Sequence, residues 1–315
     1  MKVLVTGGAG FIGSHVVEEL IYHRYEVVVV DNLVTGRRHN LPDQVKLYEM
    51  DINDPHLETV FQLEKPDHVI HLAAQASVVE SLKSPYFDFE TNMTGTVKVA
   101  LLAEQYHVRK MIFASTAAVY GDPVYLPVDE QHPVSQQSYY ALSKYSAERF
   151  IELSNLLQGL NYTILRFSNV YGPKQNAEGE AGVVSIFINR LLASEEVTIY
   201  DGSQTRDFIY VKDVATACRL AMESETIGVF NISSAKDIPI LHLFERLSDM
   251  MGIYATPVFE PARVGEIKQS VLDNSNARYG LGWEIRFPLK AGLSETIRYY
   301  SESVYGPKVN KQDMK

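Results

Sequence analysis

The stretch YYALSKY, residues 139–145, carries hydroxyl and amino side chains that could transfer a proton. Only Tyr140 and Lys144 are four residues apart, so on a helix they lie on one face, whereas Tyr139 and Tyr145 have no lysine at that offset. A phenol with a pKa of about 10 is a poor base near neutral pH, but an ammonium group beside it favours the phenolate. The pair predicts a tyrosine that acts as a general base; taken alone, a surface pair would be the better interpretation.

A strand predicted at residues 110–116 ends in Ser115 and Thr116, and the helix with YYALSKY follows it. In parallel α/β sheets, ligands bind at the carboxyl ends of the strands. A hydroxyl group at this place could hold the substrate oxygen from which Tyr140 takes a proton. Thr116 is the preferred residue for this role, and Ser115 is the alternative.

The segment TGGAGFIGSH follows the first predicted strand, residues 2–6. Its glycines fit two spacings of dinucleotide-binding loops, because Gly10 and Gly13 are preceded by both Gly7 and Gly8. Such glycines allow a tight turn and let backbone and a helix N-terminus approach a pyrophosphate. The loop therefore predicts a dinucleotide site rather than a turn alone.

Acidic residues end the next two predicted strands. The carboxylate of Asp31 would accept hydrogen bonds from ribose hydroxyls and repel a 2′-phosphate, which favours NAD over NADP. Arg37 and Arg38 could instead hold such a phosphate, although a solvated loop is the plainer interpretation of both. Asp51 could accept from the adenine amino group or cap the helix that follows.

Short apolar runs alternate with helical patterns through the first half of the chain. This alternation predicts an α/β fold, a Rossmann-type doubly wound parallel sheet covered by helices on both faces. The predicted strands are 2–6, 26–31, 45–51, 67–74, 110–116 and 161–167, and the predicted helices are 11–23, 56–64, 86–106 and 138–157.

The pattern loosens after residue 168, which predicts a smaller interleaved α/β substrate-binding lobe. Residues 207–223 and 228–232 look like a return of strand and helix to the main sheet. The expected division is an NAD-binding domain of residues 1–168 with 206–232 returning to it, and a nucleotide-sugar-binding lobe of residues 169–205 and 233–315.

Composition narrows the partners. The net charge of −10 disfavours nucleic acid, because a nucleic-acid binder needs a basic face. No apolar run is long enough to predict a membrane span. One cysteine, Cys218, and no export leader favour a cytoplasmic location. The 9 histidines lack the spacing of a metal site, so no metal is expected.

Several blocks resemble the extended short-chain dehydrogenase/reductase family, and within it the nucleotide-sugar 4-epimerases. Besides the glycine loop and the Tyr-x-x-x-Lys pair, the matching blocks are HLAAQASV (71–78), TNMTGT (91–96), LRFSNVYGP (165–173), GSQTRDFIYVKDV (202–214) and PARVGEIKQSVLDNSNARYGLGW (261–283). The resemblance covers nearly the whole chain. It implies NAD as cofactor and a UDP-sugar as substrate.

Matched position by position, the resemblance implies a set of binding residues. The cofactor would be held by Gly7, Gly10, Phe11, Ile12, Gly13, Asp31, Asn32, Asp51, Ile52, Leu72, Ala73, Ala74, Gln75, Asn92, Ser115, Tyr140, Lys144 and Phe167. The substrate would be held by Ser77, Thr116, Asn169, Gly182, Val183, Thr198, Tyr200, Arg206, Arg263, Glu266 and Ser270. Of these, Arg206 and Arg263 would clamp the pyrophosphate, as paired guanidinium groups can.

Two alanines point to the type of reaction. Related dehydratases and decarboxylases carry acids near the positions of Ala117 and Ala118, and elimination needs such a carboxylate. Their absence favours oxidation and reduction at C4. The resemblance then implies interconversion of UDP-glucose and UDP-galactose through a transient 4-keto sugar. A UDP-glucuronate 4-epimerase, another NAD(P)-dependent nucleotide-sugar C4 oxidoreductase and a non-catalytic nucleotide-binding protein are the alternatives.

Further expectations follow from the resemblance. Ser270 matches a gate position where a small residue admits N-acetyl groups, so N-acetylhexosamine nucleotides would also be accepted. Ala76 stands where some members carry a lysine near the cofactor phosphates, so NAD retention could be weaker. A homodimer through the helices near 86–106 and 138–157 is also implied.

Overall fold

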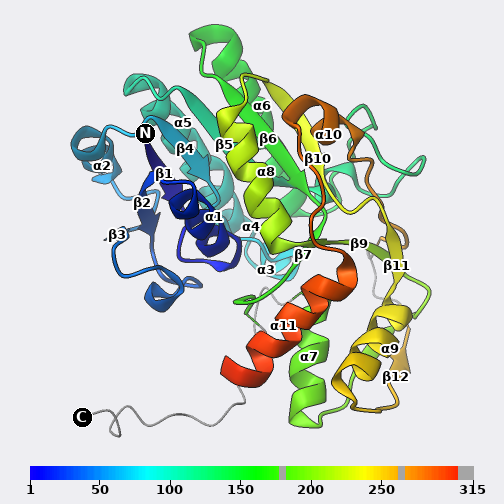
Figure 1. The fold of residues 1–315 in the computed structure, drawn as a ribbon. Coiled ribbons are helices and arrows are strands. Elements are labelled where there is room, and N and C mark those ends of the chain that lie inside the picture. The colour runs from blue at the N-terminus through cyan, green and yellow to red at the C-terminus, as the bar shows by residue number, and fades with distance from the viewer. Residues whose placement is uncertain (177–181, 262–266, 304–315) are drawn as a thin grey trace, which may run out of the picture.

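A sheet of seven parallel strands forms the centre of the protein, which is described here as a computed structural model of residues 1–176, 182–261 and 267–303 (Figure 1). The strand order is β10-β6-β5-β4-β1-β2-β3. The prediction of a doubly wound α/β fold is confirmed. The strands are β1 (Lys2–Thr6), β2 (Glu26–Asp31), β3 (Lys46–Glu49), β4 (His68–His71), β5 (Lys110–Thr116), β6 (Tyr162–Phe167) and β10 (Gly228–Ile232).

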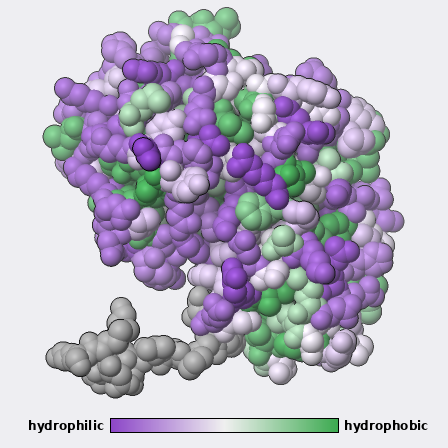
Figure 2. All heavy atoms as spheres, viewed as in Figure 1, coloured by the Kyte–Doolittle hydropathy of each residue, from purple (hydrophilic) through white to green (hydrophobic). Residues whose placement is uncertain are grey.

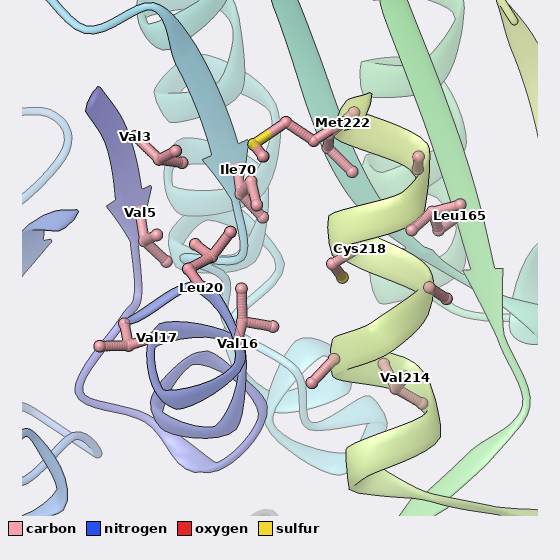
Figure 3. Packing of buried hydrophobic residues seen from close by; sticks show 14 of the residues in the cluster. Val3, Val5, Val16, Val17, Leu20, Ile70, Leu165, Val214, Cys218 and Met222 are labelled. Atoms are coloured by element: carbon pink, nitrogen blue, oxygen red, sulfur yellow. The ribbon is translucent and has the colours of Figure 1, made fainter. Parts of the chain in front are cut away.

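Helices cover both faces of this sheet, because successive side chains of a strand point to opposite faces. In β1, Val3 and Val5 pack against α1 (Phe11–Tyr22) and α8 (Val211–Glu223), as Figure 3 shows. Leu4 packs into the core of the other face. That face is covered by α2 (Leu57–Glu64), α5 (Gly95–Gln105) and α6 (Tyr139–Gln158), and α10 (Ser275–Leu281) lies beside α8.

The start of α6 is fixed by its cap. Ser138 is the N-cap residue, and its hydroxyl accepts a hydrogen bond from the backbone N–H of Ala141. Gly159 ends the helix in a left-handed conformation at φ 81°. Tyr140 therefore lies in the first turn of the helix, at the edge of the sheet where β5 ends.

The helix predicted at 86–106 is divided. Its residues form α4 (Pro85–Phe89), a π-helical turn labelled η2 (Glu90–Thr94) and then α5, and α3 (Val78–Lys83) precedes them. A π turn in a helix often marks a functional place, because it redirects side chains. Here it carries Asn92, which is fully buried.

The smaller lobe holds two further sheets below the main one (Figure 1). Strand β9 pairs with β7 and β11 and not with the main sheet, which corrects the expectation that a strand at 207 returns there; α8 and β10 do return. The remaining elements are β7 (Asn169–Tyr171), α7 (Val183–Ala193), β8 (Thr198–Tyr200), β9 (Thr205–Tyr210), β11 (Asp237–Pro239), α9 (Ile240–Met251), β12 (Val258–Glu260), α11 (Leu289–Ser303), η1 (Arg38–Asn40) and η3 (Ala117–Tyr120).

Hydrophilic residues cover most of the face drawn in Figure 2, and hydrophobic ones form only small patches on it. Among the described residues, none of the helices combines the length and the apolar character needed to cross a bilayer. Several exposed apolar side chains lie on α3, α4 and α6.

Candidate active site

A cavity of about 380 Å³ opens where the carboxyl ends of the central strands meet the N-termini of α1 and α7. Most of the predicted residues line it. The lining includes Gly7, Gly10, Phe11, Ile12, Gly13, Asp31, Asn32, Asp51, Ile52, Leu72, Ala73, Ala74, Ser115, Thr116, Tyr140, Lys144, Phe167, Asn169, Gly182 and Val183.

Two glycines make the floor of this cavity possible. Gly7 has a φ of 70°, and a Cβ atom there would lie 2.6 Å from the backbone nitrogen of Ala73. A Cβ atom on Gly13 would overlap the carbonyl oxygen of Gly7. The N-cap of α1, Gly10, has no side chain to cap the helix, so the first-turn N–H groups are left for an anion.

Asp31 lies at the end of β2 with its carboxylate anchored to the backbone. Its Oδ2 accepts a hydrogen bond from the N–H of Ala9 at 2.9 Å, and its Oδ1 accepts one from the N–H of Leu33 at 2.9 Å. Burial raises the pKa of Asp31, and the backbone N–H groups oppose that rise. The guanidinium of Arg38 donates to backbone carbonyls of its own loop, so it is already engaged there.

Asp51 lines the cavity and does not cap the helix that follows, because the N-cap of α2 is His56; its contact with adenine stays a prediction. Its Oδ1 accepts a hydrogen bond from the N–H of Asn53 at 2.8 Å, before α2 begins. Its Oδ2 accepts one from the amide of Asn32 at 2.8 Å, which fixes two lining side chains relative to each other.

The cavity also contains the predicted proton-transfer pair. Tyr140 is half-buried, and Lys144 is only 3% exposed. The ammonium nitrogen of Lys144 lies 4.3 Å from the ring centre of Phe113. Burial lowers the pKa of Lys144 to about 8, while the nearby carboxylates of Glu148 and Asp88 act to raise it. The lysine can thus carry a positive charge next to a phenol near neutral pH.

Ser115 and Thr116 differ in their hydrogen bonds, and the difference favours Thr116 for the predicted role. The hydroxyl of Ser115 donates to Oε1 of Glu148, which is itself paired with Arg166 at 2.6 Å. The hydroxyl proton of Ser115 is therefore already engaged in a hydrogen bond with a buried carboxylate. Thr116 lines the cavity and accepts a hydrogen bond from the N–H of Ala118 at 3.1 Å, and its contact with a substrate oxygen stays a prediction.

Three predicted residues lie next to the cavity rather than in its lining. Gln75, Ser77 and Asn92 belong to a buried hydrogen-bonded group, in which Asn92 Oδ1 accepts from Gln75 N at 2.8 Å. The hydroxyl of Ser77 caps α3 by accepting from Glu80 N at 3.2 Å. These side chains support the loop that carries Leu72 to Ala74.

The predicted residues of the lobe are more scattered. Thr198, Tyr200, Arg206 and Ser270 are partly buried and lie outside the cavity lining. The guanidinium of Arg206 donates to the carbonyl oxygen of Thr205 at 2.9 Å. The roles of these residues stay predictions, and Arg263 and Glu266 lie outside the described residues.

The lining contains polar residues that the sequence analysis did not single out, namely Thr35, Thr91, Ser168, Tyr171 and Gln175. Ser168 could have been found because it stands between Phe167 and Asn169, both of which were named. Gln175 had no such signal. Its amide lies against Gly182, where a Cβ atom would be 2.6 Å from Nε2, so that glycine brings the start of α7 close to the cavity.

A parallel sheet whose first strand ends in this glycine loop, and whose β5 and α6 supply Thr116, Tyr140 and Lys144, is the architecture of a short-chain dehydrogenase/reductase. A family model described as the NAD dependent epimerase/dehydratase family matches residues 3–233. The chain belongs to this family, which confirms the resemblance seen in the sequence.

Similar proteins extend over almost the full length. A relative from Methanocaldococcus jannaschii, described as a putative UDP-glucose 4-epimerase, is 41% identical over 94% of this chain and 97% of its own. The UDP-glucose 4-epimerase of Thermotoga maritima, solved with UDP-glucose, has a TM-score of 0.93 at 44% identity, covering 96% of this chain and 99% of that one. The UDP-N-acetylglucosamine 4-epimerase of Methanobrevibacter ruminantium, solved with UDP-N-acetylmuramic acid, has a TM-score of 0.92 at 35% identity, covering 96% and 98%.

Replacing Lys144 by Met should change how stability depends on pH in nucleotide-free protein. The pKa of about 8 in the folded chain lies below the ordinary 10.5, so between these values the unfolded chain binds more protons and wild-type stability rises with pH. Lys144→Met lacks this rise. The unfolding free energy of the variant minus that of the wild type should therefore fall by roughly 2 kcal/mol between about pH 7.5 and about pH 9.5. Urea unfolding measures both, and a constant difference would contradict the burial of a charged lysine.

Proposed function

We propose that the protein is an NAD-dependent nucleotide-sugar 4-epimerase that interconverts UDP-glucose and UDP-galactose. The observation that carries this proposal is the placement of Thr116, Tyr140 and Lys144 in the same cavity as the glycine cradle. The similarity to UDP-glucose 4-epimerases over nearly the whole chain supports it. Ala117 and Ala118, where a dehydratase would need acids, favour epimerisation over elimination.

The cavity fits NAD as the cofactor. At Gly7 and Gly13 a Cβ atom would collide with neighbouring backbone, so only glycine allows the tight turn of this floor, and the uncapped start of α1 offers N–H groups to a pyrophosphate. Asp31 would accept from the ribose hydroxyls, and its negative charge disfavours a 2′-phosphate. When bound, NAD supplies the capacity to accept a hydride from C4 and to return it.

The residues of the chain account for the proton chemistry. Tyr140, as the phenolate, takes the proton of the 4-hydroxyl group and becomes the neutral phenol, and the ammonium of Lys144 stabilises the phenolate from which this step starts. Thr116 donates to the same substrate oxygen and keeps it in place. The start of α7 at Gly182 and Val183, uncapped by a side chain, would hold the diphosphate, leaving the 4-keto hexose to turn before its reduction.

Experiments can distinguish three alternative functions from this proposal. A UDP-glucuronate 4-epimerase would invert C4 of the uronic acid in preference to the neutral sugars. Another C4 oxidoreductase would consume or release NAD(P)H in proportion to product. A non-catalytic nucleotide-binding protein would bind the same ligands without turnover, since the fold alone does not fix function.

The Tyr140→Phe variant should lose roughly 10²–10⁴-fold in kcat, because it keeps the aromatic ring and removes the general base. Turnover is measured by NMR as inversion at C4 of UDP-galactose, UDP-N-acetylglucosamine and UDP-glucuronate. Tyr139→Phe is the matched control, since Tyr139 is adjacent and has no lysine at the catalytic spacing. Full activity of Tyr140→Phe, or no inversion of any of these sugars by the wild type, would refute the proposal.

We propose in addition that N-acetylhexosamine nucleotides are substrates. The similarity to a UDP-N-acetylglucosamine 4-epimerase supports this, as does the small side chain of Ser270. Ser270 lies close in sequence to Leu272, whose N–H donates to the buried carboxylate of Asp207 at 3.2 Å. That bond fixes the backbone near the proposed gate.

Replacing Ser270 by Tyr should abolish inversion of UDP-N-acetylglucosamine and keep inversion of UDP-glucose, because a bulky ring fills the space for the N-acetyl group. Ser270→Ala should keep both activities and serves as the size-matched control. NMR of both substrates with each variant measures the ratio. A wild type that does not turn over UDP-N-acetylglucosamine would contradict this specificity.

We propose that two copies pair through α4 and α6 to form a homodimer. These helices pack against each other, on the face of the sheet opposite to α1 and α8 (Figure 1). Apolar side chains of both helices are exposed in the single chain. A large exposed apolar patch is unusual on a protein surface unless a partner covers it. The exposed side chains are Tyr86, Phe87 and Phe89 of α4 and Leu142, Leu153, Leu156 and Leu157 of α6.

Leu153→Glu should shift the protein from dimer to monomer, because it places a charge in the proposed apolar contact. Leu63→Glu is the matched control, since Leu63 is equally an exposed leucine on a helix but lies on α2, outside this patch. Size-exclusion chromatography with light scattering measures the mass of each. A monomeric wild type, or the same mass for both variants, would contradict the proposed dimer.

Two broader assignments accompany this function. We propose that residues 1–168 and 206–232 bind NAD, and that residues 169–205 and 233–315 bind the nucleotide sugar. Strand β9 belongs to the second sheet, although all of its residues except Thr205 fall in the first group. We also propose a cytoplasmic location, for which the single and buried Cys218 is the supporting observation.

A further inference from the structure

A fully buried carboxylate lies behind the catalytic helix. Asp88, on α4, accepts three hydrogen bonds, from Gln75 Nε2 at 2.7 Å, from Asn92 Nδ2 at 3.2 Å and from Ser143 Oγ at 2.5 Å. All three donors are neutral and buried. An ionised carboxylate can only accept hydrogen bonds, so this arrangement suits the charged form.

Asp88 has no ion pair with an arginine or lysine among the described residues at salt-bridge distance. A negative charge buried in this way is costly unless a positive charge lies nearby. Ser143 is adjacent in sequence to Lys144, and the carboxylate of Asp88 acts on that lysine through space. No hydrogen bond or ion pair engages the ammonium of Lys144 itself within the described chain.

A second carboxylate near Lys144, that of Glu148 one turn later on α6, opposes the fall of the lysine pKa more than Asp88 does. It also accepts two hydrogen bonds from Arg166 of β6, so its charge is shared with that guanidinium. His71 of β4 is kept uncharged, because burial and the charge of Lys144 lower its pKa to about 3. Tyr140 is the group on which the lysine acts. Asp88 is therefore the carboxylate near Lys144 whose charge is not already paired.

We propose that Asp88 is a positioning residue whose carboxylate is the counter-ion of the Lys144 ammonium and keeps that ammonium charged beside Tyr140. Burial alone would remove the proton from the lysine at the upper end of the physiological pH range, and an uncharged lysine would not favour the phenolate. Asp88 opposes this loss. The expected effect on turnover rests on the proposed function. The pairing of the two charges does not depend on that function.

The test compares Asp88→Asn with Ser143→Ala. Asp88→Asn removes the charge and keeps the shape; the new amide can donate to Ser143, whose hydroxyl is 3.1 Å from the carbonyl oxygen of Tyr140 and can donate there. The alkaline limb of the pH profile of kcat should move down by about one pH unit in this variant. Ser143→Ala breaks a hydrogen bond but keeps the charge, so its limb should stay at the wild-type position.

A double-mutant cycle tests the charge pair without any activity. Unfolding free energies of the full-length wild type, Asp88→Asn, Lys144→Met and the double variant should be non-additive near neutral pH, and the coupling should fade as the lysine loses its proton. Asp88→Ser, which leaves room for a water, replaces Asp88→Asn if that variant does not fold. Additive free energies, an unmoved limb in Asp88→Asn, or an equal shift in Ser143→Ala would overturn the proposal. A wild type without turnover would instead refute the epimerase function and leave the cycle to decide the pairing.

Discussion

Burying one lysine ammonium among the central strands is the constraint on which the site depends. Lys144 must be close enough to a phenol to change its acidity, and that requires removal from water, which disfavours its own charge. The ring of Phe113 and the two carboxylates of Glu148 and Asp88 offset this cost by stabilising the positive charge of the ammonium. One of them, Glu148, is paired with Arg166 and also accepts a hydrogen bond from the hydroxyl of Ser115. The same carboxylate therefore helps to stabilise the charge and favours Thr116 over Ser115 as the hydroxyl proposed to contact the substrate.

The doubly wound sheet makes this concentration of groups possible. Strands that are far apart in sequence end at one edge, so the glycine loop after β1, Asp31 after β2 and Thr116 at the end of β5 surround one cavity. The lobe closes the other side with the start of α7. Because Gly10 and Gly182 both leave helix starts uncapped, two anion-accepting ends face the same space, which suits two phosphate-bearing ligands held end to end.

Much of this was predictable where local chemistry decides the structure. Apolar runs of β-branched residues fixed the positions of β1, β2 and β5, and the four-residue spacing alone separated Tyr140 from its neighbours. The sheet joined by β9 was not predictable, because an apolar strand carries no mark of its partner. The roles of Ser115 and Gln75 depended on partners distant in sequence, Glu148 and Asp88, and a single sequence contains no record of such contacts.

Asp88 lies on α4, a helix with one side next to the site and the other side on the surface of the protein. Its buried carboxylate accepts a hydrogen bond from Ser143 of α6, while Tyr86 and Phe87 of the same helix are exposed. Helix α4 has only five residues, and its own hydrogen bonds cannot keep it in place, since such short helices are marginal in isolation. Its position is set by the buried hydrogen bonds on one side and, in the proposed dimer, by the partner on the other. In that dimer, contact between subunits would stabilise the helix that supplies the proposed counter-ion, and assembly would then favour the charged form of Lys144.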